Sequence, residues 1–395
     1  MRRFWILVAA LAGSSVTAFS AVPLHERAPR VPTSLSADVS RREVFQSALF
    51  TASLLSTTSP AVAAPLAGQI DLPPIGFGAW AWGDPLVWGY NKKNDGDLKE
   101  VFDYAIANAK RNKVLIDTAE VYGTGRSETL IGEFGKGTDA DKVLVATKFA
   151  ALPFRTKADD VVKACEASLK RLGRPIDLYQ IHFPGAWSNE EYWDGLTKAY
   201  EKGLVKSVGV SNYGVDATRA CHAALAKRGI QLATNQIQLS LLYRWPLENG
   251  LMQACDDLGI KVLSYSPLAL GLLTGKYTDD NPPSGFRKTL YQQVKKTPDY
   301  DNLLATMKDV SAAHSGSTLS QVAINWTRAK NSIPIPGART LGQVQKNYDA
   351  LSWSMSKEEE RALDLAAAKV TTFISPDKSP FPKKDINTGL VMFDS

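Results

Sequence analysis

The sequence of 395 residues is poor in the side chains that build metal centres and disulfide frameworks. It contains three cysteines and four histidines. Cys165, Cys221 and Cys255 form no C-x-x-C pair, and no two histidines stand at the H-x-x-x-H spacing of a zinc site. We therefore expect free packed thiols and no metal centre.

Long apolar runs and a strong excess of one charge are missing too. No run reaches the roughly eighteen apolar residues that would indicate a membrane-spanning helix. Six of the 46 basic and three of the 40 acidic residues lie in residues 1–63, which leaves 40 basic against 37 acidic residues in the rest. This near balance argues against nucleic acid as a partner. The missing apolar run argues against an integral membrane segment in the folded part.

Residues 1–63 have the composition of a targeting presequence. Two arginines precede the apolar residues 4–12, and Val16 and Ala18 stand at the spacing that signal peptidase needs. Residues 19–40 are rich in serine, proline and arginine, which is typical of a transit peptide. This arrangement predicts plastid import across several membranes.

A second stretch with the features of a targeting signal follows this segment. Arg41 and Arg42 precede a mildly apolar stretch and the sequence Ala61-Val62-Ala63, an arrangement that resembles a twin-arginine thylakoid signal. More transit peptide is the alternative, so stroma and thylakoid lumen both stay open. We predict a presequence over residues 1–63 and one folded domain over residues 64–395.

From residue 70 onward, short β-branched runs alternate with helical stretches such as residues 158–172 and 190–202, as expected of parallel βαβ units. Eight such runs fit a closed barrel better than an open sheet, and no G-x-G-x-x-G follows the first run. The sequence therefore predicts an α/β fold with a single (β/α)8 TIM barrel. The eight runs are residues 75–80, 114–119, 143–149, 177–183, 205–212, 232–238, 261–268 and 332–337.

Active sites of such barrels lie at the carboxyl ends of the strands. Asp117, Lys148 and His182 stand at three successive ends, and Tyr122 follows the first of them. A phenol with a pKa of about 10 is a weak acid, and a nearby ammonium stabilises its phenolate. We expect Lys148 to lower the pKa of Tyr122, Asp117 to hold Lys148, and His182 to orient a carbonyl substrate.

On these residues and several further motifs, the chain resembles the aldo-keto reductase family from about residue 70 to about residue 365. The motifs are residues 76–80, 117–123, 177–182, 203–212, 265–268 and 335–339. Residues 79–84, 146–153 and 184–187 also resemble plant and algal chloroplast members related to pyridoxal reductase. The resemblance implies that Asp117, Tyr122, Lys148 and His182 form the catalytic tetrad of a carbonyl reductase.

The resemblance also implies NADPH as the cofactor. Arg339 would select NADPH, because a guanidinium matches the extra 2′-phosphate. Family members often have an acid at the position of Lys346, where it contacts the adenine. A lysine cannot accept a hydrogen bond from the adenine amino group, so adenine binding would be weaker. The implied cofactor residues are Ser211, Asn212, Gln236, Tyr265, Ser266, Leu268, Lys276, Gly337, Arg339, Gln343 and Asn347, with Arg287 as a further phosphate contact.

The substrate is expected to be a small carbonyl compound in an aromatic-walled pocket. Trp80 and Trp187 are the main candidates for its walls, together with Trp82, Trp88 and Phe149. Pyridoxal, quinones and lipid-derived aldehydes all fit such walls. The alternative functions are a regulatory module that binds NADPH and reports redox state without turnover, and a scaffold that binds no cofactor.

Overall fold

The computed structural model describes residues 66–370 except 86, 111–112 and 186–188, together with residues 383–384 and 391–392. The predicted presequence over residues 1–63 lies outside the described residues, as does Trp187.

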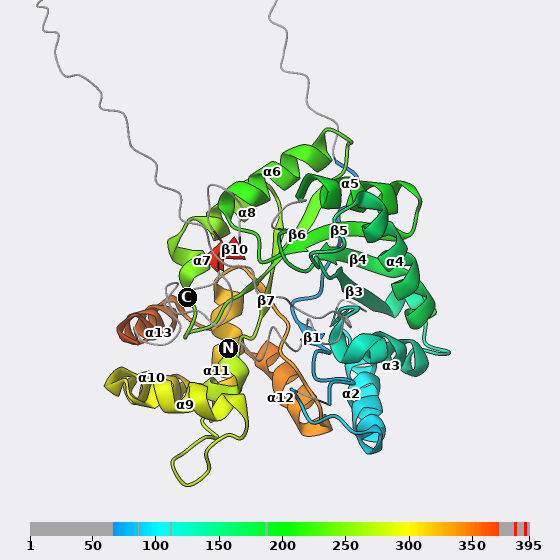
Figure 1. The fold of residues 1–395 in the computed structure, drawn as a ribbon. Helices are drawn as coiled ribbons and strands as arrows, with labels where there is room; N and C mark the ends of the chain where they lie inside the picture. The colour runs from blue at the N-terminus through cyan, green and yellow to red at the C-terminus, as the bar shows by residue number, and fades with distance from the viewer. Residues whose placement is uncertain are drawn as a thin grey trace, which may run out of the picture. The chain divides into compact units, whose positions relative to one another are not determined.

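Eight parallel strands follow one another around a barrel in sequence order (Figure 1). The first and the last strand are joined by a parallel bridge between Gly78 and Gly337, and the Gly78 amide donates to the Pro336 carbonyl at 3.1 Å. The predicted barrel is therefore confirmed. The strands are β1 Gly76–Gly78, β2 Val114–Asp117, β3 Val143–Phe149, β4 Ile176–Ile181, β5 Val205–Ser211, β6 Leu232–Gln238, β7 Lys261–Tyr265 and β8 Ile333–Pro334.

Helices connect the strands and surround them (Figure 1). They are α2 Asp95–Ala107, α3 Arg126–Phe134, α4 Ala158–Leu172, α5 Asn189–Glu201, α6 Val215–Ala226, α7 Trp245–Glu248, α8 Leu251–Asp257, α9 Phe286–Lys295, α10 Pro298–Ala313, α11 Leu319–Ala329, α12 Leu341–Asp349 and α13 Lys357–Lys369. Two further short strands, β9 Lys383–Lys384 and β10 Val391–Met392, pair antiparallel with each other. No helix of the described residues is long and apolar enough to cross a membrane.

Local sequence explains why these helices begin and end where they do. In α4, Asp159 and Asp160 lie in the first turn, where negative charge complements the helix dipole. Gly173 ends the helix with a left-handed φ of 60°, a conformation that glycine adopts without a Cβ clash. The boundaries predicted for this helix are confirmed.

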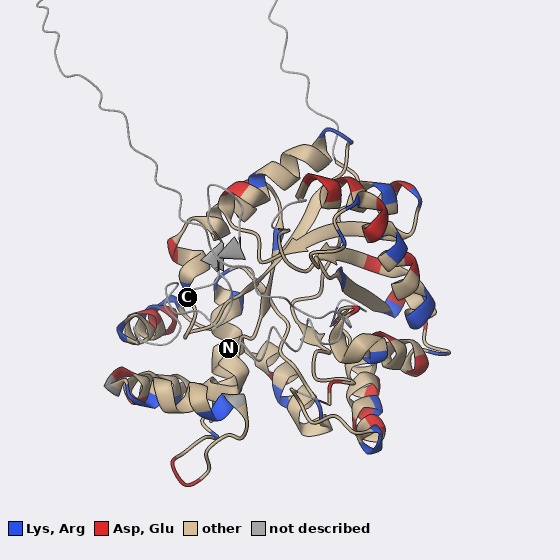
Figure 2. Cartoon of the chain, viewed as in Figure 1, with Lys and Arg blue, Asp and Glu red and all other residues tan. Residues whose placement is uncertain are grey.

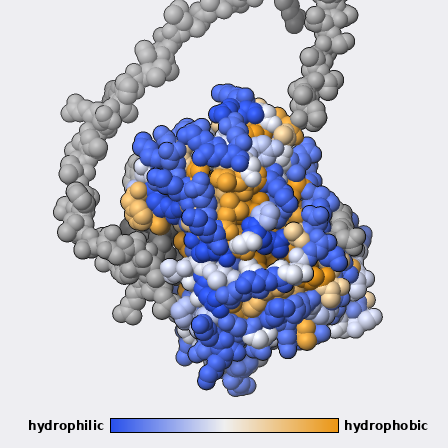
Figure 3. Space-filling model, turned by 90° about the vertical axis from the view of Figure 1, so that its right-hand side faces the viewer, coloured by the Kyte–Doolittle hydropathy of each residue, from blue (hydrophilic) through white to orange (hydrophobic). Residues whose placement is uncertain are grey.

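Two layers of side chains make up the core. Inside the barrel, Leu115, Leu144, Leu178, Leu263 and Ile335 pack together. Outside it, the other faces of the strands pack against the helices. Charged residues lie mainly on the outer helix faces (Figure 2), and hydrophobic side chains reach the surface only in patches between hydrophilic ones on the face seen in Figure 3.

The alternation of side chains along each strand places the polar residues. Lys148 follows Leu144 and Ala146 at two-residue steps, so it points to the same interior as these two. Asp117 follows Leu115 in the same way on the neighbouring strand. The apolar interior therefore ends at the carboxyl ends of the strands in a layer of polar side chains.

Candidate active site

The centre of this polar layer is a buried ion pair between β2 and β3. The Lys148 ammonium donates to Asp117 Oδ1 at 2.6 Å and to the Thr118 carbonyl at 2.8 Å. The Lys148 side chain is wholly buried and that of Asp117 is 3% exposed. Such a pair is tolerated only where further hydrogen bonds satisfy its remaining polar atoms.

Side chains from β4 and β6 provide these hydrogen bonds. Gln236 Nε2 donates to the second oxygen of Asp117 at 2.7 Å, and Gln180 Nε2 reaches the same oxygen at 3.5 Å. Thr234 in turn donates to Gln180 Oε1 at 3.4 Å. Sequence reasoning placed Gln236 with the cofactor and missed its bond to Asp117, because that bond joins residues 119 positions apart.

Tyr122 and His182 lie next to this ion pair. The Lys148 nitrogen is 5.1 Å from the centre of the Tyr122 ring. The rings of Tyr122 and His182 meet edge to face, with centroids 5.7 Å apart. The structure therefore brings all four predicted tetrad residues together.

The protonation of these groups follows from their surroundings. Desolvation raises the pKa of Tyr122 well above its usual 10, and the negative charge of Asp117 adds to the shift. Desolvation and the charge of Lys148 lower the pKa of His182 well below 6.5, while desolvation lowers the pKa of Lys148 against the pull of Asp117. Desolvation dominates, so the pKa of Tyr122 is raised on balance, and the expectation that Lys148 lowers it stays a prediction. Burial therefore favours the protonated phenol of Tyr122 and the uncharged imidazole of His182.

The loop that carries Tyr122 touches the loop after β1. Gly123 has a φ of 55°, and a Cβ at this position would lie 2.1 Å from the Gly83 carbonyl oxygen. Only a glycine permits this approach, since any side chain would displace one of the two loops. The glycine after Tyr122 therefore fixes the position of the phenol.

An ion pair links the loop that carries Tyr122 to the loop that follows β3. Arg155 donates to Glu120 Oε1 at 2.7 Å, and the Ala150 amide donates to the same oxygen at 2.6 Å. The Arg155 guanidinium also lies 4.3 Å from the centre of the Phe149 ring. Because Glu120 stands two residues before Tyr122, this contact links the tyrosine loop to the segment just beyond Lys148. Sequence reasoning missed this pairing, because no local pattern joins Glu120 to Arg155.

Polar residues at the ends of β5 to β7 form a second group. The Tyr265 hydroxyl donates to Asn212 Oδ1 at 2.8 Å, and Asn212 Nδ2 donates to the His182 carbonyl at 3.0 Å. Ser211 donates to the Gln236 carbonyl at 2.8 Å. Asn212 and Ser266 have φ values of 63° and 51°, and such strained non-glycine residues gather at ligand sites.

The segments after β7 and β8 carry the other predicted cofactor residues. Leu268 is half-buried and Lys276 is exposed on the first of them. On the second, the Arg339 amide donates to Gln343 Oε1 at 2.8 Å, and Asn347 Nδ2 donates to the Gly337 carbonyl at 3.4 Å. Because β5, β6, β7 and β8 are neighbours in this order, the carboxyl ends of these four strands and the segments after them form one continuous rim of the barrel. Lys346 is exposed beside buried Asn347.

The aromatic residues divide into three groups. Trp80 is half-buried, and its ring centre lies 6.2 Å from that of Tyr122, as expected for a pocket wall. Trp82 and Phe149 are buried in the core, so the expectation that they line the pocket is wrong. Trp88 lies against two arginines.

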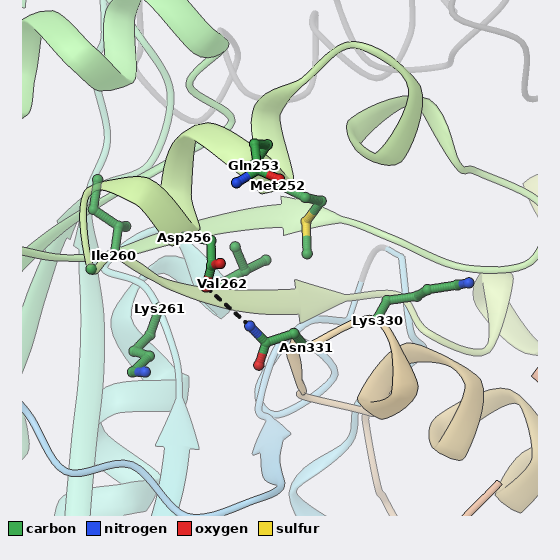
Figure 4. Close-up of a pocket in the computed structure, with 9 residues that line it drawn as sticks. Met252, Gln253, Asp256, Ile260, Lys261, Val262, Lys330 and Asn331 are labelled. Carbon is green, nitrogen blue, oxygen red and sulfur yellow. Dashed lines mark hydrogen bonds between the residues drawn. The ribbon is translucent and has the colours of Figure 1, made fainter. Parts of the chain in front are cut away.

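A separate hollow lies at the opposite end of β7. It has a volume of about 190 Å³. Its lining includes Met252 and Asp256 of α8, Lys261 where β7 begins, and Asn331, which donates to Asp256 at 3.3 Å (Figure 4). None of its lining residues belongs to the site described above.

Comparisons with known proteins show the family of this chain. Residues 74–368 match the model of the aldo/keto reductase family. The chain is 41% identical over 318 residues to the chloroplastic pyridoxal reductase of Arabidopsis thaliana, covering 76% of this chain and 84% of that protein. It is 30% identical over 319 residues to the aldo-keto reductase yakc [NADP(+)] of Schizosaccharomyces pombe, covering 76% and 91%.

A solved structure is similar as well. An aldo-keto reductase from Klebsiella pneumoniae in complex with NADPH superimposes with a TM-score of 0.57 at 26% identity, covering 76% of this chain and 93% of that one. The family match spans the whole barrel and includes all four residues of the predicted tetrad. The chain therefore belongs to the aldo/keto reductase family of oxidoreductases.

Proposed function

We propose that this protein is an NADPH-dependent reductase that converts aldehydes or ketones to alcohols, with Tyr122 as the general acid. One observation carries the proposal. The buried pair of Asp117 and Lys148 lies beside the Tyr122 phenol and the His182 imidazole, all at the carboxyl ends of neighbouring strands. This arrangement suits protonation of a carbonyl oxygen.

Each residue has a distinct task in this proposal. Tyr122 donates the proton to the substrate oxygen. Lys148 stabilises the phenolate left behind, because its charge lies near the ring, and Asp117 keeps Lys148 charged and in place. His182, being neutral, donates a hydrogen bond to the substrate oxygen and orients it.

The residues along the rim fit a nicotinamide dinucleotide. Ser211, Asn212 and Gln236 offer amide and hydroxyl groups for the carboxamide, and Tyr265 offers an aromatic face for the ring. Arg339 offers a guanidinium for the 2′-phosphate, which would select NADPH over NADH. When bound, the reduced nicotinamide supplies the hydride for the reaction. The relative from S. pombe, named for NADP(+), supports this choice.

For the substrate we propose a planar aromatic aldehyde of the pyridoxal type. The Trp80 ring next to Tyr122 provides a flat apolar wall against which such a ring can stack. The Arabidopsis relative is named a pyridoxal reductase, which supports the same substrate class.

The test is NADPH oxidation, followed by absorbance, with the chain from Ala64 onward. Pyridoxal and a panel of aromatic aldehydes serve as substrates, and Tyr122→Phe is the variant. We expect turnover with the unaltered chain, and its loss in Tyr122→Phe with NADPH binding retained. Tight NADPH binding without turnover on any carbonyl would favour the regulatory module instead, and no binding would favour the scaffold.

We propose plastid import for residues 1–63, supported by their composition and by the relative named chloroplastic. A fusion of residues 1–63 to a fluorescent protein should enter plastids. Protease protection in intact thylakoids then separates a lumenal location from a stromal one, since only a lumenal protein resists digestion there.

A further inference from the structure

The loop between β1 and α2 carries a tryptophan whose polar atom is buried without a partner. The indole N–H of Trp88 donates to no acceptor among the described residues. Buried donors are normally paired, and an unpaired one is a candidate contact for a ligand. The loop lies near the end of β8, because β1 and β8 are joined by the bridge between Gly78 and Gly337.

Two arginines flank this indole. The Arg287 and Arg339 guanidiniums lie 5.2 and 5.7 Å from the centre of the Trp88 ring. Arg339 also donates to the Trp88 carbonyl at 3.0 Å. Within the described chain neither arginine forms an ion pair with an acid. The site therefore offers an indole N–H and two cations, and it suits an anion rich in acceptor oxygens.

The charge of Arg287 also acts on Arg339. Burial lowers the pKa of Arg339, and the positive charge of Arg287 lowers it further. Two like charges held together without a counter-charge favour an anion between them. A phosphate group has the oxygens to accept hydrogen bonds from both guanidiniums and from a third donor.

We propose that Trp88 is a third donor to the 2′-phosphate of NADPH, with its indole N–H acting beside Arg339 and Arg287. This inference rests on the proposed use of NADPH and adds a residue from the β1–α2 loop to its recognition. Trp88 thereby helps to select NADPH over NADH, and it does not take part in the proton transfer at Tyr122.

The ring of Trp88 has a second contact that the test must preserve. It meets Trp80 edge to face at 5.3 Å, and Trp80 faces Tyr122. Trp88→Phe removes the N–H and keeps an aromatic ring at this position. The matched control is Trp353→Phe, because Trp353 also has a buried, unpartnered indole N–H and stacks on His314, away from the proposed site.

Isothermal calorimetry measures the binding of adenosine 2′,5′-bisphosphate and of adenosine 5′-monophosphate to the unaltered chain and both variants. Loss of a hydrogen bond to a charged group predicts about tenfold weaker binding of the bisphosphate to Trp88→Phe. Binding of the monophosphate should not change, and Trp353→Phe should bind both like the unaltered chain. In steady-state kinetics, Trp88→Phe should raise KM for NADPH and leave KM for NADH and for the carbonyl unchanged.

Two results would overturn the inference, and they have different meanings. If Trp88→Phe binds the bisphosphate as tightly as the unaltered chain, Trp88 is no phosphate donor, while the proposed function still holds. If the unaltered chain itself does not prefer the bisphosphate over the monophosphate, the proposed NADPH specificity fails and the inference fails with it.

Discussion

Replacing Lys148 by methionine tests how strongly the buried ion pair depends on both partners. Methionine is similar in length to the lysine stem, so the change removes the ammonium with little loss of volume. Asp117 would keep its bonds from Gln236 and Gln180 but would lose its only cation among the described residues. We expect turnover to be lost, because no charge remains to stabilise the Tyr122 phenolate.

The cost in stability follows from the burial of the pair. Removing one partner of a buried ion pair costs about 3–5 kcal/mol, since the other charge stays buried and uncompensated. Lys148→Met should lower the free energy of unfolding by this amount. Asp117→Asn combined with Lys148→Met removes both charges, so the double variant should lose at least about 2 kcal/mol less than the sum of the two single variants.

Urea unfolding of the cofactor-free protein, followed by tryptophan fluorescence, measures these differences. Lys99→Met is the control, because Lys99 pairs with Asp103 on α2 with both side chains about half exposed. It should change the free energy of unfolding by no more than about 0.5 kcal/mol. The reasoning fails if Lys148→Met is as stable as this control, or if the two tetrad substitutions add up without any coupling.

Three further predictions concern the groups around the pair. His182 stays neutral when folded, so below about pH 6.5 the unfolded chain binds a proton that the folded chain does not, and the free energy of unfolding should fall by up to about 1.4 kcal/mol per pH unit. Urea unfolding between pH 7.5 and 5.5 should show that the free energy of unfolding falls more steeply with decreasing pH in the unaltered chain than in His182→Gln. An equal fall in both proteins would contradict this prediction. Glu120→Gln weakens the contact with Arg155 and should cost about 1–3 kcal/mol in urea unfolding and lower kcat for an aromatic aldehyde, whereas an unchanged kcat would mean that this contact does not position Tyr122. Gly123→Ala should lower kcat at least tenfold with NADPH binding by fluorescence intact, because its Cβ meets the Gly83 carbonyl, and full activity would show that the loops separate easily.

Much of the fold follows from patterns that are local in the sequence. The predicted limits of β3, β6 and α4 coincide with the observed ones. The first and last strands are shorter than predicted, with β1 at Gly76–Gly78 and β8 at Ile333–Pro334. Beyond β8, Gly337 forms only a single bridge with Gly78, and the Ile335 amide donates to the Ser264 carbonyl at 3.0 Å.

Aromatic residues show where local patterns are insufficient. Trp80 and Trp82 stand two positions apart after the same strand and look alike in the sequence. In the fold, Trp80 faces Tyr122, while the Trp82 indole donates to the Ala338 carbonyl at 2.9 Å and is fully buried. A loop has no fixed period, so the direction of each side chain depends on what the loop packs against.

The sequence by itself determined the barrel and its order of strands, and it placed Asp117 and Lys148 on the inner side at the strand ends, because side chains alternate along a strand with a two-residue period. Only the tertiary structure decided the protonation of these groups, the bond of Gln236 to Asp117, and the arginines around Trp88. Desolvation, electrostatic coupling and loop contacts depend on which distant segments meet in space. No local sequence pattern predicts which distant segments come into contact.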